Sequence, residues 1–165
     1  MSVEDLRRYQ LHLASLGASY ARMNQVRAAK YAEAKALGYE LVSYVSSQCS
    51  FLTQFPHGDN CFVLEDNTVQ PFVRIGSNVT LWSGNHIGHH SVIKDHCFIA
   101  SQVVVSGFCT VGTSCFIGVN ATFGNNLEVG DDCLIGAGAF RNQTENAWLD
   151  ALGAALDRIR NEHSQ

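Results

Sequence analysis

The chain has few of the features that mark several large classes of protein. Its 165 residues carry 11 Lys and Arg against 15 Asp and Glu, which gives a formal net charge of -4. An acidic balance argues against a nucleic-acid partner or an anionic membrane surface. No apolar run approaches the ~20 residues that span a bilayer, and the segment MSVEDLRRYQ lacks the apolar stretch of a signal peptide. We therefore expect a cytoplasmic protein without membrane insertion.

Two common site motifs are also missing. There is no G-x-G-x-x-G, so nothing in the sequence indicates a dinucleotide site. The six cysteines contain no C-x-x-C pair, which argues against a zinc site. Each cysteine instead falls four residues after the start of a six-residue unit, in a column of mostly small or apolar residues. We expect reduced thiols that face the core, and no metal.

A six-residue repeat dominates the chain from residue 45 to residue 140. Steps of six from Ile75 reach only apolar residues as far as Ile135. This period fits neither an amphipathic helix nor a flat strand alternation, and it is typical of a solenoid of short strands and tight turns. Glycine often follows the leading aliphatic residue, where a turn requires either positive φ or close backbone approach.

The segment before the repeat predicts a helix over residues 24–37. Asn24 is a good N-cap and Gly38 is a C-terminal stop signal. Residues 39–45 then predict a strand. Residues 2–16 fit either a capped helix or a short strand, and the sequence leaves these alternatives open.

After the repeat, residues 147–161 place apolar side chains on one helical face, which predicts a capping helix. We therefore divide the chain into three parts. They are a short α/β segment at 1–44, an all-β solenoid at 45–140 and a C-terminal helical segment at 141–165.

The repeat resembles the hexapeptide-repeat acyltransferases of bacteria, whose units carry an aliphatic residue, often Gly, and later a small residue. Within that group it is similar to sugar acetyltransferases of the sialic-acid O-acetyltransferase and bacillosamine or perosamine N-acetyltransferase type. IGHHSVIKDHCFIA resembles their catalytic coil, and CFIGVNAT resembles the following acetyl-CoA coil. The resemblance implies a left-handed parallel β-helix, with residues 1–44 as the remnant of a nucleotide-sugar-binding domain. It also implies a homotrimer whose active sites lie between subunits.

The resemblance also implies site residues. The catalytic histidine of the family falls on His89, and His90 stands where relatives commonly have an acid. His86 is a further catalytic candidate close by. The acetyl-CoA contacts fall near four positions, namely Phe98, Gly118, Val119 and Ala137.

The chemistry implied is transfer of an acetyl group from acetyl-CoA to an amino or hydroxyl group of a sugar, for surface-polysaccharide biosynthesis. A histidine suits this reaction because the nucleophile must lose a proton as it attacks an already activated thioester. Two alternatives stay open. One is a structural or regulatory β-helix without activity. The other is a carbonic-anhydrase-like metal enzyme, which the spacing of the histidines disfavours.

Overall fold

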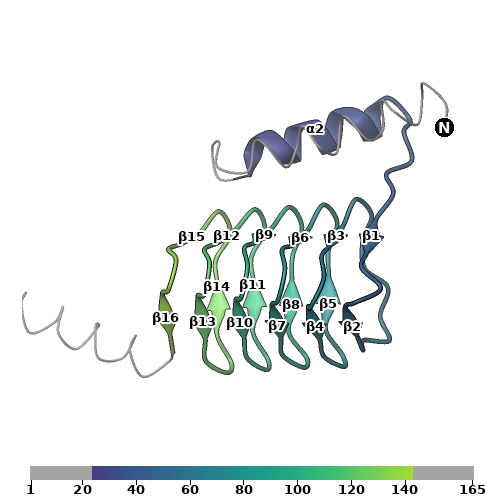
Figure 1. The fold of residues 1–165 in the computed structure, drawn as a ribbon. Coiled ribbons are helices and arrows are strands. Elements are labelled where there is room, and N and C mark those ends of the chain that lie inside the picture. The colour runs from purple at the N-terminus through teal and green to yellow at the C-terminus, as the bar shows by residue number, and fades with distance from the viewer. Residues whose placement is uncertain (1–23, 143–165) are drawn as a thin grey trace, which may run out of the picture.

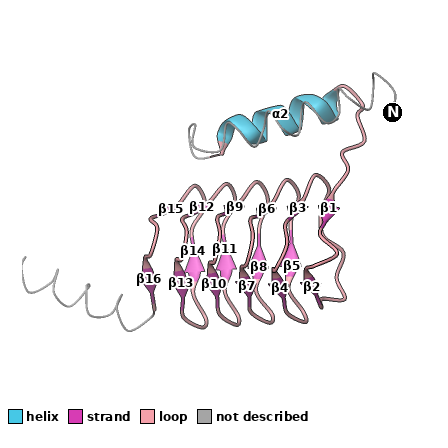
Figure 2. Cartoon of the chain, viewed as in Figure 1, coloured by secondary structure: helices cyan, strands magenta, loops and turns pink. Residues whose placement is uncertain are grey.

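The computed structural model describes residues 24–142, which form a parallel β-solenoid with one helix alongside it (Figures 1 and 2). The predicted parallel β-helix is confirmed over this range. The helices considered at 2–16 and 147–161 lie outside the described residues. Across residues 24–142 no helix is long and apolar enough to cross a bilayer.

The solenoid is built from two-residue strands that form three parallel sheets. Sheet A contains β1 (Tyr44–Val45), β3 (Phe62–Val63), β6 (Thr80–Leu81), β9 (Phe98–Ile99), β12 (Phe116–Ile117) and β15 (Leu134–Ile135). Sheet B contains β2 (Ser50–Phe51), β4 (Thr68–Val69), β7 (His86–Ile87), β10 (Val104–Val105), β13 (Thr122–Phe123) and β16 (Phe140–Arg141). Sheet C contains β5 (Arg74–Ile75), β8 (Val92–Ile93), β11 (Thr110–Val111) and β14 (Glu128–Val129).

One coil of the solenoid contains 18 residues, or three hexads. In sheet B, Thr68 pairs with His86 and His86 pairs with Val104, which fixes this register. The second residue of each strand points inward, because successive side chains of a strand alternate between faces. Ile87, for example, is fully buried beside Val105. The six-residue period therefore arises because each hexad places one aliphatic side chain in the core from one of the three sheets.

The cysteines lie where the sequence predicted them, as free thiols that face the core. Cys61, Cys97, Cys109 and Cys115 are buried, and Cys49 and Cys133 are half-buried. Burial raises the pKa of the Cys61 thiol to about 11. The Cys61 side chain therefore packs as a small neutral group rather than as a reactive thiolate.

The turns between strands use the left-handed backbone conformation at one fixed position. From Asn60 to Gly138 every sixth residue has a positive φ, between 53° and 77°, and only two of them are glycine. The glycines that follow the leading aliphatic residue allow close backbone approach instead. A Cβ on Gly88 would lie 2.5 Å from the carbonyl carbon of Ser106. Crowding between coils, not positive φ, explains Gly76, Gly88, Gly112 and Gly118, whereas Gly130 and Gly136 have open space around them.

Helix α2 spans Gln25–Ala36, close to the predicted bounds, and is followed by Gly38 with φ 80°. Asn24 is the N-cap residue, as predicted, but its side chain makes no capping hydrogen bond. Its Nδ2 instead donates to the carbonyl oxygen of Cys115 at 2.9 Å. The strand predicted at 39–45 is also shorter, since only β1 forms.

Arg27 attaches helix α2 to the solenoid through carbonyl groups of neighbouring coils. Its guanidinium is 2% exposed and donates to the oxygens of Asn78 (2.9 Å) and His96 (3.3 Å). Burial lowers the pKa of Arg27 to about 10, so the side chain stays charged at neutral pH. At the other end of the helix, Tyr31 and Lys35 both donate to the carboxylate of Asp59 at 2.6 Å. The helix therefore crosses several coils along one corner of the solenoid.

Sheet C begins one coil later than the other two sheets because the ladder is interrupted at Pro56. The first residue of each strand donates its N–H to the carbonyl of the next coil, as Arg74 does to Ser91 at 2.9 Å. Pro56 occupies this position in the first coil and has no N–H to donate. The hydroxyl of Thr53 donates to the Val73 carbonyl instead, at 2.7 Å.

Candidate active site

The predicted catalytic histidines lie at the corner where the chain passes from sheet B to sheet C. His86 begins β7, and His89 and His90 form the turn before β8. The side chains of His89 and His90 are exposed. This exposure follows from the hexad, because the inward positions of IGHHSV belong to Ile87 and Ser91, which are fully buried.

His89 and His90 are joined by a hydrogen bond between their rings, with the two Nδ1 atoms 3.1 Å apart. One Nδ1 carries the proton and the other accepts it, which leaves Nε2 of each ring for other partners. The backbone of His89 is held from both neighbouring coils. Its N–H donates to Oε1 of Gln70 at 2.9 Å, and its carbonyl accepts the N–H of Phe108 at 2.9 Å.

His90 is stacked between two aromatic rings from the coils on either side. Its ring centroid lies 4.6 Å from that of Phe72 and 4.8 Å from that of Phe108, with interplanar angles of 26° and 18°. His89 meets the Phe108 ring edge-on at 5.1 Å. Stacked and edge-on contacts of this kind favour one ring orientation. The aromatic column thus restrains both imidazoles.

Phe72 and Phe108 were not identified from the sequence as part of this site. They stand 18 residues before and after His90, so writing the repeat in rows of 18 would place the three rings in one column. Both have positive φ, as does His90, but this conformation recurs at every sixth residue. It is therefore a property of the turn and not a strain confined to the histidines.

Gly107 gives His89 its space. A Cβ at position 107 would lie 2.8 Å from Cε1 and 2.9 Å from Nε2 of the His89 ring. The N–H of Gly107 also donates to Oδ1 of Asn125 at 2.9 Å, so its backbone is fixed. The imidazole of His89 therefore occupies part of the space that a side chain at position 107 would need.

His86 does not join the other two histidines. Its side chain is on the outer face of sheet B, and in the described part of the chain no hydrogen bond or ring contact connects it to His89 or His90. Its neighbour Asn85 is buried in a ladder with Asn67, where the N–H of Asn85 donates to Oδ1 of Asn67 at 3.1 Å. This asparagine supports the coil rather than a histidine.

The predicted coenzyme contacts lie at a different corner, between sheets A and B. Gly118 and Val119 follow β12, and Ala137 is one coil further on. A Cβ on Gly118 would lie 2.6 Å from the backbone nitrogen of Ala137, so these coils are in close contact. Sheet B separates this corner from His89. The two corners therefore lie at opposite edges of sheet B.

The fourth predicted contact, Phe98, lies on the outer face of sheet A and is only 8% exposed. Its ring stacks on Phe116 at 5.5 Å, and the guanidinium of Arg27 lies 5.7 Å from its centroid. Its role in binding coenzyme stays a prediction. No group of three or more metal-ligand side chains occurs within residues 24–142.

The repeat matches a known family over part of its length. Residues 73–107 match the family described as "Bacterial transferase hexapeptide (six repeats)", and this range includes the whole histidine turn. No curated protein matches the chain closely enough to be counted a relative.

Several solved structures share the fold. The acetyltransferase domain of PglB from Neisseria gonorrhoeae FA1090 matches with a TM-score of 0.70 and 21% identity, over 74% of this chain and 60% of that one. The same domain in complex with acetyl coenzyme A matches with a TM-score of 0.64 and 20% identity, over 73% of this chain and 60% of that one. PerB from Caulobacter crescentus, in complex with CoA and GDP-perosamine, matches with a TM-score of 0.68 and 21% identity, over 72% of this chain and 57% of that one.

The chain thus spans about 60% of the length of these neighbours. At this level of identity the likeness concerns the fold, and activity has to be argued from the residues. The part of the repeat at residues 73–107 is thus similar to the hexapeptide repeat of bacterial transferases, and the chain folds as a parallel β-helix with His89 and His90 exposed at one corner.

Proposed function

We propose that the protein is an acetyltransferase that moves an acetyl group from acetyl-CoA to an amino or hydroxyl group of a nucleotide-linked sugar. The observation that carries the proposal is the hydrogen-bonded, exposed pair of His89 and His90 on the hexapeptide solenoid. Support also comes from the structural neighbours, which are titled as an acetyltransferase domain and as a complex with CoA and GDP-perosamine.

In the proposed reaction His89 is the general base. The acceptor nitrogen or oxygen attacks the carbonyl carbon of the thioester, and Nε2 of His89 accepts the proton that the acceptor loses. The tetrahedral intermediate then breaks its C–S bond, and the proton passes to the departing thiolate. General-base assistance of this kind contributes ~10²–10⁴-fold to the rate.

His90 is a positioning residue in this scheme. For Nε2 of His89 to be unprotonated, Nδ1–H of His89 must donate to Nδ1 of His90, across the observed 3.1 Å. The same bond persists when His89 takes up a proton, because His89 is the donor in both states. The stacking of His90 between Phe72 and Phe108 keeps the acceptor in place. A second imidazole therefore orients the base without supplying a negative charge.

We further propose a homotrimer with its active sites between subunits. The support is the separation of the histidine corner from the predicted coenzyme corner within one chain. Residues 1–44 are proposed as the remnant of a nucleotide-sugar-binding domain, 45–140 as the catalytic β-helix and 141–165 as a capping segment. Surface-polysaccharide biosynthesis is the proposed role. The free thiols favour a reducing compartment such as the cytoplasm.

Calorimetric titration with acetyl-CoA tests the cofactor, and release of free CoA thiol in the presence of amino-sugar nucleotides tests the reaction. We expect saturable acetyl-CoA binding and acceptor-dependent thiol release. Absence of binding at millimolar coenzyme would contradict the proposal and favour a structural or regulatory solenoid. Sedimentation tests the assembly, and a stable monomer would argue against an active site shared between subunits.

A further inference from the structure

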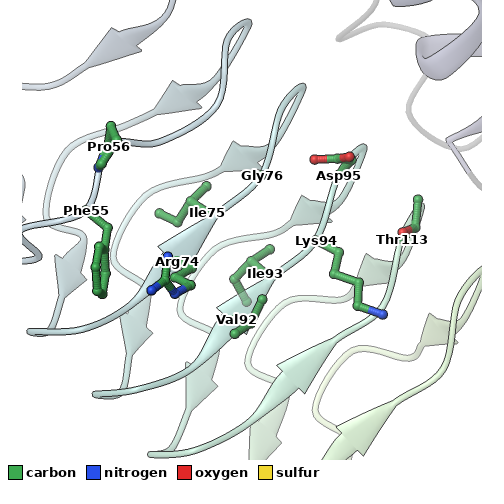
Figure 3. Close-up of a pocket in the computed structure, with 10 residues that line it drawn as sticks. All are labelled: Phe55, Pro56, Arg74, Ile75, Gly76, Val92, Ile93, Lys94, Asp95 and Thr113. Carbon is green, nitrogen blue, oxygen red and sulfur yellow. The ribbon is translucent and has the colours of Figure 1, made fainter.

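The interruption at Pro56 leaves a pocket on the outer side of sheet C, distinct from the histidine turn. Its volume is about 360 Å³. Figure 3 shows that the lining residues come from the irregular segment before sheet C, from β5, β8 and the turns that follow them, and from the turn after β11. The lining residues are Phe55, Pro56, Arg74, Ile75, Gly76, Val92, Ile93, Lys94, Asp95 and Thr113.

The pocket contains both basic residues of the solenoid. Between positions 45 and 140 the sequence has only Arg74 and Lys94 as Lys or Arg. Arg74 begins β5, and Lys94 directly follows β8, the adjacent strand of sheet C. With strand spacings of about 4.8 Å and ~3.3 Å per residue, their Cα atoms are about 8 Å apart. Both side chains can therefore reach a single anionic group or a pair of linked ones.

Arg74 is oriented but not neutralised. Its guanidinium carbon lies 3.8 Å from the centroid of the Phe55 ring, a cation–π contact that covers one face of the fork. Among residues 24–142, no carboxylate forms an ion pair with it. The edge of a stacked guanidinium still presents its N–H donors, which match the geometry of phosphate oxygens.

Lys94 is also only weakly engaged. Its Nζ lies 4.0 Å from Oδ1 of Asp131, and both side chains are at least half exposed, so this pair contributes little. The other acid at the pocket, Asp95, already accepts the backbone N–H of Ser77 through Oδ1 at 2.7 Å. The pocket is thus a place where an acidic protein gathers two available cations beside an aromatic ring.

From these contacts we infer that the pocket binds phosphate groups of a nucleotide ligand, with Arg74 as the main contact and Lys94 as the second. Val92, which lies between the two cations in Figure 3, is only three residues beyond His89. Three residues of chain span at most about 10 Å, so the histidine turn lies close to the pocket. The inference rests on the proposed function for the choice of nucleotide, since both a nucleotide-linked acceptor and coenzyme A carry a diphosphate.

Calorimetry on the full chain tests the inference with three probes: inorganic pyrophosphate, GDP and coenzyme A. Arg74→Gln removes the charge and the fork but keeps much of the length of the side chain. A lost charged hydrogen bond weakens binding about ten- to a hundredfold. We expect this loss for pyrophosphate, and for whichever of GDP and coenzyme A places its diphosphate here. Lys94→Gln should give a smaller loss for the same probe.

Lys30→Gln is the matched control, because Lys30 is an exposed cation of helix α2 that pairs only with Glu33. It should leave all three affinities unchanged. Phe55→Leu should weaken pyrophosphate binding while Arg74 is present and have no effect in the Arg74→Gln background. Thermal unfolding of each variant separates a folding defect from a lost contact.

The outcomes separate this inference from the proposed function. Equal affinities of the wild type and Arg74→Gln for all three probes would overturn the phosphate site, even if acetyl transfer is observed. Arg74-dependent pyrophosphate binding without any acetyl-CoA binding would support the site and contradict the acetyltransferase. Dependence seen with GDP alone identifies the acceptor side, and dependence seen with coenzyme A alone identifies the coenzyme side.

Discussion

His90 and His96 occupy the same position in consecutive hexads, IGHHSV and IKDHCF, yet the fold gives them opposite surroundings. Both have left-handed backbones, with φ 60° and 63°. His90 lies at the corner between sheets B and C, where no helix of the described residues covers the turn and the side chains of His89 and His90 are exposed. His96 lies at the corner between sheets C and A, beneath helix α2, where Tyr31 meets its ring edge-on at 5.3 Å.

At the covered corner a ladder of side chains forms hydrogen bonds from coil to coil. Nδ2 of Asn60 donates to Oδ1 of Asn78 at 2.9 Å, and Nδ2 of Asn78 donates to Nδ1 of His96 at 2.9 Å. The ladder thus uses His96 as an acceptor, which requires the neutral ring. Burial lowers the pKa of His96 in the same direction. The same backbone turn therefore holds a structural histidine, His96, where a helix covers it, and an exposed histidine, His90, where no helix of the described residues does.

The largest expected effect is that of His89→Ala, which removes the proposed base from the exposed corner. We expect turnover to fall by at least a hundredfold, about 3 kcal/mol of barrier, while acetyl-CoA affinity is largely retained. The measurement is steady-state kinetics with coenzyme binding in parallel. His96→Asn serves as the control, because its amide can replace the ring in the ladder. If turnover of His89→Ala is unchanged, the base lies elsewhere, and His86 becomes the next candidate.

The next largest effect is expected for Arg27→Met, which keeps an apolar stem but removes the donors to acceptors in two neighbouring coils and to Asn24. We expect the free energy of unfolding to fall by about 2–4 kcal/mol, because buried carbonyl groups lose a charged donor. Denaturant unfolding followed by circular dichroism measures this loss. Lys30→Met on the exposed side of the same helix should change stability by only a few tenths of a kcal/mol, as exposed pairs do.

A smaller effect comes from Gly107→Ala. The new Cβ would lie 2.8 Å from Cε1 of His89, so the imidazole has to rotate away from its present position. We expect kcat to fall about tenfold, since a misplaced general base loses part of its contribution. Gly130→Ala is matched to it, because the nearest atom to its Cβ would be Sγ of Cys133 at 3.8 Å. Equal rates for the two variants would show that the ring position does not matter.

The smallest effect concerns pH. Since burial lowers the pKa of His96 below its ordinary value of 6.5, the unfolded chain takes up a proton before the folded chain does. Stability should therefore decline as pH falls below about 6.5, and the decline should continue down to the folded-state value. His96→Asn should flatten this part of the profile of unfolding midpoint against pH. An unchanged slope would assign the pH dependence to other groups.

The sequence predicts the solenoid well because its period is local, with one inward aliphatic side chain in each hexad. The exposure of His89 follows from the same register. The contacts of Asn24 could not be predicted, because they depend on where helix α2 lies against the solenoid. The aromatic neighbours of His90 could have been predicted, because they stand one 18-residue coil before and after it. The pocket at Arg74 could not have been predicted, because it depends on the N–H that Pro56 lacks and on the contact of the Thr53 hydroxyl.

The missing N–H of Pro56 also affects whether another chain can add strands to the first coil of the solenoid. The first coil of a parallel β-helix is an open edge onto which another chain can add strands. Here the Val73 carbonyl is satisfied by a side chain, and residues 52–58 form no strand. Two of the three sheets begin with a strand of the first coil, while the third begins a full coil later. A second solenoid stacking on this end would meet a staggered surface, which disfavours fibre formation.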